Sequence, residues 1–246
     1  MSKHIKAEWY RITHTQPYFR WYVIVGILIV IMPVLAFPKA FENDLCTALM
    51  NSLGGMGFIM SALLSVITAV MTANIYMSRL HYYEVMDGAS VHKIILSKLI
   101  THFSVITVFY VLPSCILFGI IYGLNGGGEM KSVPLFFLLY IINMYHLSLR
   151  SVLLSIIVRS FNGSMLVSYI PIILELMPYM LLINLMPEHL ETIQKIFNFF
   201  PTIQLMCLPM PEYTSQFTAA VIIGFLVSMT ALYALAYYVY SKTDFK

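Results

Sequence analysis

Long apolar runs are the feature of this sequence that most limits how the chain can fold. Runs of about 18 or more apolar residues, the length that an α-helix needs to cross ~30 Å of hydrocarbon, recur six times. They lie near residues 21–37, 52–77, 99–123, 134–158, 165–186 and 217–240. The chain is 60% hydrophobic and only 10% charged, whereas about 25% of residues are charged in soluble domains. The sequence therefore predicts an all-α polytopic membrane protein with six transmembrane helices.

The connections between these runs are short. An outer-membrane barrel would show alternating segments of about 10 residues, and these runs are apolar throughout. The six runs and their connections use nearly all of residues 1–246. We therefore expect a single transmembrane domain over residues 1–246 and no separate soluble domain.

Lysine and arginine residues are distributed unevenly between the two sides of the predicted bundle. Cations in short loops mark the cytoplasmic side of a membrane protein. With the N-terminus inside, only Lys39, Lys131 and Lys195 fall outside. The other eleven of the fourteen fall inside: Lys3, Lys6, Arg11, Arg20, Arg79, Lys93, Lys98, Arg150, Arg159, Lys242 and Lys246. We expect both termini in the cytoplasm and the chain in the plasma membrane. The net charge of +3 is consistent with attraction to anionic lipid headgroups. It does not indicate binding of nucleic acid.

The residues before the first apolar run indicate an interfacial helix. Ile5, Trp9 and Ile12 lie along one side of a helix, while cations such as Lys6 and Arg11, with Glu8 among them, lie elsewhere. This is the pattern of a helix in the headgroup layer. An ordinary basic flank is the alternative that the sequence leaves open.

A long connection between the fifth and sixth runs also has helical character. In residues 187–216, apolar side chains recur at helical spacing from Leu190 to Phe200, and Pro201 ends the pattern. A second apolar piece, TIQLMCL, follows. We expect two small helices that lie on the outer membrane surface or dip into it. Cys46 and Cys207 both fall on this side and could pair, although single thiols are the ordinary case.

Polar side chains form a stripe on the fourth predicted span. Tyr140, Asn143, His146 and Arg150 share one helical face, and Glu175 of the fifth span lies at the level of His146. Ionisable groups inside a membrane are costly to bury and are candidates for function. Pairing of Glu175 with a cation on this face would lower the cost of burying both charged groups. The stripe is either part of a substrate path or proton-sensitive latch, or a polar contact that holds two helices together.

Motifs for enzymatic chemistry are missing from the sequence. GGGEMKS at 126–132 lacks the glycine directly before lysine that a phosphate-binding loop needs. Ser90 has no base predicted at the same depth in the membrane that could activate it as a nucleophile. No HExxH motif or Cys/His cluster suggests a metal site. We therefore expect no catalytic residue, metal or nucleotide site on this chain. A membrane-embedded enzyme using Glu175, His146 and Asn143, or a non-transporting scaffold, are the alternatives.

The polar stretch YYEVMDGASVHKIILSK separates the second and third spans. Asp87 and Gly88 interrupt the helical pattern, and Ser90 can cap a new short helix that follows. On that helix, Val91 and Ile95 share a face while His92, Lys93 and Ser97 point elsewhere. An amphipathic helix of about two turns over 91–98, lying on the inner surface, offers its second face to the cytosol. Such a face suits docking of a partner.

This combination resembles the permeases of type-2 ATP-binding-cassette (ABC) exporters over the whole chain. Lys6-Ala7-Glu8 followed by Arg11 is similar to the Glu-x-x-Lys of that family's lead-in helix. Gly88-Ala89-Ser90 followed by Ser97-Lys98 is similar to its Gly-x-Ser-Arg and Ser-Lys pattern, with Val91 where arginine is common.

The resemblance implies a permease subunit that works with separate ATPase subunits. The family's inner helix is a coupling helix that fits into a cleft of the ATPase. Its counterpart here comprises Glu84, Met86, Asp87, Gly88, Ser90, Val91, His92, Lys93, Ser97 and Lys98. Two ATPase subunits would carry ATP and Mg²⁺, and a second permease, identical or homologous, would complete the pathway. The implied function is export of a hydrophobic or amphipathic substrate across a bacterial cytoplasmic membrane. Small permeases of this kind often confer lantibiotic or bacteriocin immunity, or efflux of peptides and drugs.

Overall fold

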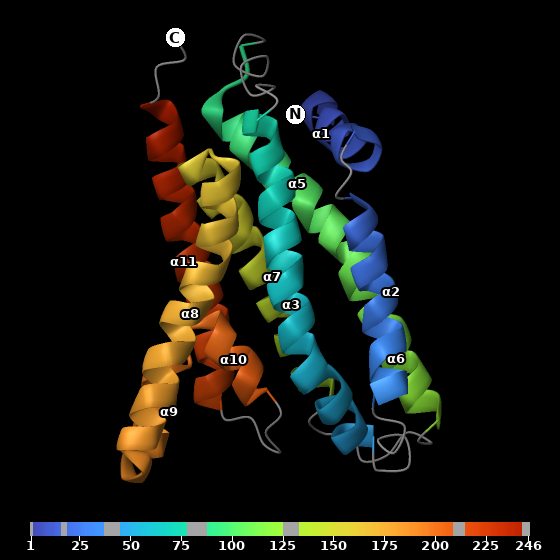
Figure 1. The fold of residues 1–246 in the computed structure, drawn as a ribbon, viewed down its shortest axis with the longest axis vertical. Coiled ribbons are helices and arrows are strands. Elements are labelled where there is room, and N and C mark those ends of the chain that lie inside the picture. Colours follow the sequence, from blue (N-terminus) through green and yellow to red (C-terminus); the bar gives the residue numbers. More distant parts are fainter. Residues whose placement is uncertain are drawn as a thin grey trace.

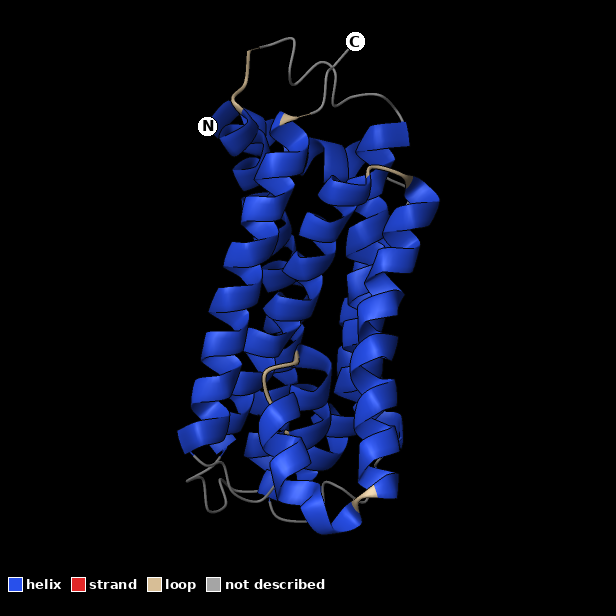
Figure 2. Cartoon of the chain, turned by 90° about the vertical axis from the view of Figure 1, so that its left-hand side faces the viewer, coloured by secondary structure: helices blue, strands red, loops and turns tan. Residues whose placement is uncertain are grey.

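The fold is an elongated bundle of helices. The computed structural model describes residues 2–15, 19–36, 45–77, 88–124, 133–208 and 215–242; within these ranges nearly every residue is helical and no strand occurs. The long helices run roughly along one axis, as two views at right angles show (Figures 1 and 2). Glu84, Met86, Asp87 and the GGGEMKS segment lie outside the described residues.

The elements follow one another along the chain as helices joined by short connections. In order they are α1 (Ser2–Tyr10), the π-helical turn η1 (Arg11–Thr15), α2 (Phe19–Ala36), α3 (Leu45–Met77), α5 (Val91–Ile106), the π-helical turn η3 (Thr107–Val111), α6 (Leu112–Leu124), α7 (Val133–Val158), α8 (Phe161–Leu185), the 3-10 turn η4 (Pro187–His189), α9 (Leu190–Phe197), α10 (Pro201–Cys207) and α11 (Ser215–Ser241).

Five helical stretches within the described residues are long and apolar enough to cross a membrane. They are Ile59–Tyr76, Val91–Ile120, Leu135–Val158, Phe161–Leu185 and Ser215–Ser241. The expected helical membrane architecture is confirmed at this level. The first expected span corresponds to α2, whose apolar stretch Phe19–Ile31 is shorter. Six spans therefore remain a prediction.

The third span begins earlier than the sequence suggested. Gly88 has a φ of +71°, a left-handed conformation that glycine adopts without steric cost. Ser90 is the N-cap residue, so the predicted start of the helix after Ser90 is confirmed. The helix then runs on through η3 into α6 without a break after Lys98. Residues 91–98 are thus the first part of the helix that continues as the third span.

Alternating helix directions bring distant segments together at the two ends of the bundle. Helix α1, the start of α5, the α7–α8 turn and the end of α11 lie at one end, and α9 and α10 lie toward the other (Figure 1). The α7–α8 turn reverses the chain through Arg159, which has a φ of 55°. Ser160 Oγ then caps α8 by accepting a hydrogen bond from Gly163 N at 3.1 Å. Helix α1 and the end of α11 thus both lie at this end of the bundle.

Helix α7 lies at the centre of the bundle, packed most extensively against α3 and α11. The two small helices expected between the fifth and sixth spans are present as α9 and α10. Helix α9 is largely exposed, whereas α10 is buried among α3, α7, α8 and α11. Thr202, Ile203 and Gln204 are all 0% exposed. The second small helix is therefore part of the core.

Candidate functional site

The start of α5 forms an exposed polar end of the bundle. Ser90, His92 and Lys93 are exposed, while Val91 is half-buried. The Ser90 side chain makes no capping hydrogen bond. His92 Nδ1 lies 2.5 Å from Tyr233 Oη of α11, so this end of α5 is tied to the last helix. Gly88 is also exposed and precedes the helix.

Ser97 and Lys98 do not belong to this exposed surface, which corrects the expectation from the sequence. Ser97 is 1% exposed, and its Oγ donates to Ile94 O at 2.8 Å. Lys98 is also 1% exposed. The physical reason is that α1 packs against α5 and covers this side of the helix.

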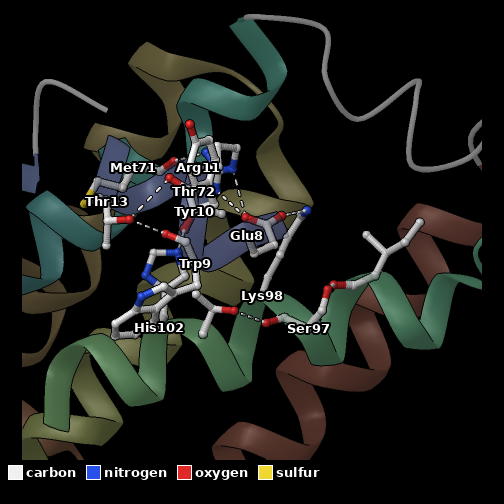
Figure 3. Close-up of polar contacts among 12 residues, drawn as sticks. Glu8, Trp9, Tyr10, Arg11, Thr13, Met71, Thr72, Ser97, Lys98 and His102 are labelled. Carbon is white, nitrogen blue, oxygen red and sulfur yellow. Dashed lines mark hydrogen bonds and ion pairs between the residues drawn. The ribbon is translucent and has the colours of Figure 1, made fainter. Parts of the chain in front are cut away.

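Lys98 belongs to a buried ion cluster, the anchor cluster, formed with Glu8 and Arg11 (Figure 3). Lys98 Nζ donates to Glu8 Oε1 at 2.6 Å. Arg11 donates to Glu8 Oε2 from Nε at 2.9 Å and from Nη2 at 2.6 Å. Glu8 is only 4% exposed, so each of its oxygens is matched by a cation, as a buried charge requires. The lead-in helix is thus joined to α5 by charge as well as by apolar contact.

The remaining lead-in residues divide between solvent and core. Lys6 is exposed and Trp9 is half-buried against the apolar core. Ile12 is 0% exposed. Arg11 also reaches Met71 O of α3 at 3.5 Å. The predicted division into an apolar and a cationic side is therefore present, but the apolar side packs on protein.

A second polar contact lies beside the anchor cluster and joins α3 to α5 (Figure 3). His102 Nε2 is 3.1 Å from Thr72 Oγ1, and both residues are buried. Sequence reasoning missed this pair, although a histidine inside an apolar span is itself a signal. The three elements α1, α3 and α5 are consequently joined by polar contacts at one end of the bundle.

The stripe on α7 pairs with α8 as its spacing predicted. Arg150 Nη1 donates to Glu175 Oε1, and both side chains are largely buried. Glu175 Oε2 accepts a hydrogen bond from Thr202 N at 3.1 Å. The carboxylate therefore links α8 to α7 and to the small helix α10. Lys98 and Arg150, which count among the cations of the predicted cytoplasmic side, are buried in ion pairs.

Part of the stripe lines a cavity of about 580 Å³, the α7–α11 cavity. Its floor holds His146, Arg150 and Glu175, together with Ser228 of α11. His146 Nε2 lies 2.5 Å from Ser228 Oγ. The walls are apolar side chains of α11 and the Phe199–Phe200 segment before α10: Phe199, Phe200, Pro201, Ile223, Val227 and Leu232. Sequence reasoning missed Ser228 because a single serine in an apolar span carries no pattern.

Tyr140 and Asn143 lie on the stripe but do not line this cavity. Asn143 Nδ2 donates to Leu139 O at 3.0 Å, and the Tyr140 ring stacks against Phe136 and Phe137. These two residues pack inside the bundle. The stripe therefore divides into a packing half and a cavity half.

The geometry offers little for acid–base catalysis by Glu175, His146 and Asn143. Glu175 is engaged by Arg150 and Thr202, and Asn143 lies outside the cavity. His146 Nδ1 has no hydrogen-bond partner among the described residues, whereas a catalytic histidine is usually oriented through its second nitrogen. In the part of the chain that the structure describes, no three metal-ligating side chains come together.

Cys207 is a free thiol in α10. Its Sγ lies 3.7 Å from Tyr179 Oη. The pairing of Cys207 with Cys46 that the sequence left open is therefore not formed. Burial raises the pKa of the Cys207 thiol.

Comparisons of the chain with protein-family models, with curated proteins and with solved structures found no match.

Proposed function

We propose that the chain is the permease subunit of an ATP-driven exporter of the type-2 ABC kind. The observation that best supports this proposal is the course of α5. The helix starts at an exposed polar end with His92 and Lys93 and continues without interruption to Ile120 across the bundle. A force applied to the exposed end would act on the whole spanning helix.

The anchor cluster extends this mechanism to the neighbouring helices. Because the Glu8–Lys98 pair is buried, separating α1 from α5 would leave uncompensated charges. Thr72 and His102 join α3 to the same helix. Closure of two partner ATPase subunits around ATP and Mg²⁺ would thus move α1, α3 and α5 together at the cytoplasmic end.

The remaining features of the proposal follow from this role. Two permease subunits, identical or homologous, would form the pathway in the plasma membrane of a bacterium. The substrate would be hydrophobic or amphipathic, and immunity against a lantibiotic or another membrane-active peptide is the narrower role we propose. ATP would be hydrolysed on the partner chain, and this chain would bind no cofactor.

Purification from native membranes tests the proposal directly. An affinity-tagged chain should recover an ABC ATPase subunit, identified by mass spectrometry, and the complex should hydrolyse ATP in a vanadate-sensitive manner. Recovery of the intact chain without any ATPase would contradict the proposal and favour a non-transporting scaffold.

A pair of charge reversals tests where the ATPase docks. Lys93→Glu changes the exposed start of α5, whereas Lys195→Glu changes an exposed lysine of α9 toward the opposite end of the bundle. We expect Lys93→Glu to lower ATPase recovery and Lys195→Glu to leave it unchanged, because charge complementarity acts at the docking face. Equal recovery with both variants would show that the start of α5 is not the docking element.

A further inference from the structure

The α7–α11 cavity combines a polar floor with apolar walls that reach the outside of the bundle. Its volume of about 580 Å³ falls in the range of ~300–1,000 Å³ that small-molecule sites occupy. Ile223 is 49% exposed and Val227 is 62% exposed. Both lie in the middle of the spanning helix α11 (Ser215–Ser241). The cavity therefore opens at the height of the membrane interior.

Arg150 brings unused hydrogen-bond donors to the floor of this cavity. An arginine carries several N–H donors and no acceptor. Among the described residues, Glu175 is the hydrogen-bond partner of the Arg150 side chain, through Nη1 alone. The Glu175 carboxylate is itself used on both oxygens, by Arg150 and by Thr202 N. Because His146 Nδ1, which is unpaired among the described residues, is inaccessible to solvent, the hydrogen-bonding capacity left in the cavity is that of the Arg150 donors, which calls for an acceptor on the ligand.

The charge of the floor restricts what kind of acceptor can bind. Arg150 and Glu175 cancel one another, and His146 lies beside them at the floor. A charged ligand would bring an uncompensated charge into a site of low dielectric constant, which is costly. An uncharged oxygen, such as an amide or ester carbonyl, can accept from Arg150 without that cost.

We infer that the α7–α11 cavity binds an uncharged amphiphile, whose carbonyl oxygen accepts a hydrogen bond from Arg150 and whose apolar chain lies against Phe199, Phe200, Ile223 and Val227. The ligand enters sideways from the bilayer, between the exposed side chains of α11 and the 199–200 segment. The identification of this amphiphile as the exported substrate rests on the proposed function. The inference that the cavity binds it is independent of that function.

Matched photoactivatable probes test the inference on the full chain in detergent. One probe is an alkyl-diazirine chain that ends in a primary amide, and the other is the same chain ending in a carboxylate, used at alkaline pH so that it is charged. After irradiation, mass spectrometry locates the labelled peptide. We expect the amide probe to label residues 223–232 saturably and the carboxylate probe to label them more weakly. Equal or stronger labelling by the carboxylate would overturn the assignment of an uncharged ligand.

Two adjacent residues of α11 provide a matched pair of blocking variants. Ile223 lines the cavity, and Ile222 is similarly exposed but does not line it. Ile223→Trp should abolish saturable labelling by filling the cavity, and Ile222→Trp should retain it. Equal labelling of the two variants would overturn the site itself.

A third variant tests Arg150 without leaving a buried charge. Replacing the pair together, Arg150→Met with Glu175→Met, removes the donors while keeping an apolar filling of similar volume. We expect the affinity for the amide probe to fall by about tenfold, the size of one lost hydrogen bond to a charged group. Unchanged affinity in this variant would overturn the role of Arg150.

These outcomes are separate from those of the proposed function. Ile223→Trp should not alter recovery of an ATPase subunit, because Ile223 is not among the α11 residues that pack on the start of α5, whereas Leu232 and Tyr233 are. If no ATPase is recovered but the amide probe labels 223–232, the site stands and the transport role fails. If an ATPase is recovered and both α11 variants label equally, the transport role stands and the binding site fails.

Discussion

Lys98 Nζ and Glu8 Oε1 lie 2.6 Å apart, although 90 residues separate them in the chain. The Lys98 side chain is 0% exposed and that of Glu8 is 4% exposed. Arg11 binds the other oxygen of the same carboxylate. The lead-in helix is therefore held to α5 by a buried ion pair as well as by apolar contacts.

Lys98→Met should destabilise the protein strongly. Removing the lysine takes away the cation at Glu8 Oε1 while Arg11 still binds Oε2, so the expected cost is that of a lost hydrogen bond between charged groups, about 1.5–3 kcal/mol. Thermal unfolding in detergent, followed by circular dichroism, measures the change. Lys93→Met, on the exposed side of the same helix, is the control and should change the unfolding temperature little. Similar unfolding temperatures for the two variants would mean that the Glu8–Lys98 pair contributes nothing.

Arg150→Met should be more harmful than the double change Arg150→Met/Glu175→Met. The single change leaves the buried Glu175 carboxylate without its cation, at a cost of about 3–5 kcal/mol. The double change removes both charges and leaves only the Thr202 N–H without its acceptor, a smaller cost of about 1–3 kcal/mol. The free energy of unfolding of each variant in detergent provides the comparison. A double variant as unstable as the single one would argue against a direct pair.

Gly26→Ala should weaken the packing of α2 on the third span. A Cβ atom at Gly26 would lie 2.5 Å from Phe109 O, a backbone atom of η3 that cannot swing away. Overpacking of this kind costs about 1–3 kcal/mol. Gly119→Ala on α6 is the matched control, because a Cβ there meets no atom within 4 Å. That control should be neutral or slightly stabilising through its higher helix propensity, and the unfolding temperatures of the two variants should differ accordingly.

Cys207 should react slowly with maleimide at neutral pH. Burial raises the pKa of its thiol, so less of the reactive thiolate is present than in a free cysteine. Labelling should accelerate as the pH rises toward that pKa. A Cys46→Ser/Cys115→Ser background isolates Cys207 for measurement by intact-protein mass spectrometry. Rapid labelling at neutral pH in the folded protein would show that α10 is not buried in the bundle.

Several features of the fold were predictable because they depend on residues close together in sequence. Apolar runs long enough to span a bilayer predicted the long helices. Gly88 and Ser90 marked the start of α5, and Pro201 marked the break between α9 and α10. The pairing of Glu175 with the α7 stripe followed from helical periodicity and a short turn, since both fix the relative level of two consecutive helices.

The sequence alone thus determined that the chain is helical and apolar, that a helix begins after Ser90, and that Glu175 meets the face carrying Arg150. The tertiary structure alone decided that Lys98 turns inward to Glu8, that Ser228 meets His146, and that α10 is buried in the core. Helical periodicity specifies which side chains share a face. Which helix covers that face depends on contacts between segments far apart in sequence, because buried charges and hydrogen-bonding groups are stabilised only where such a partner reaches them.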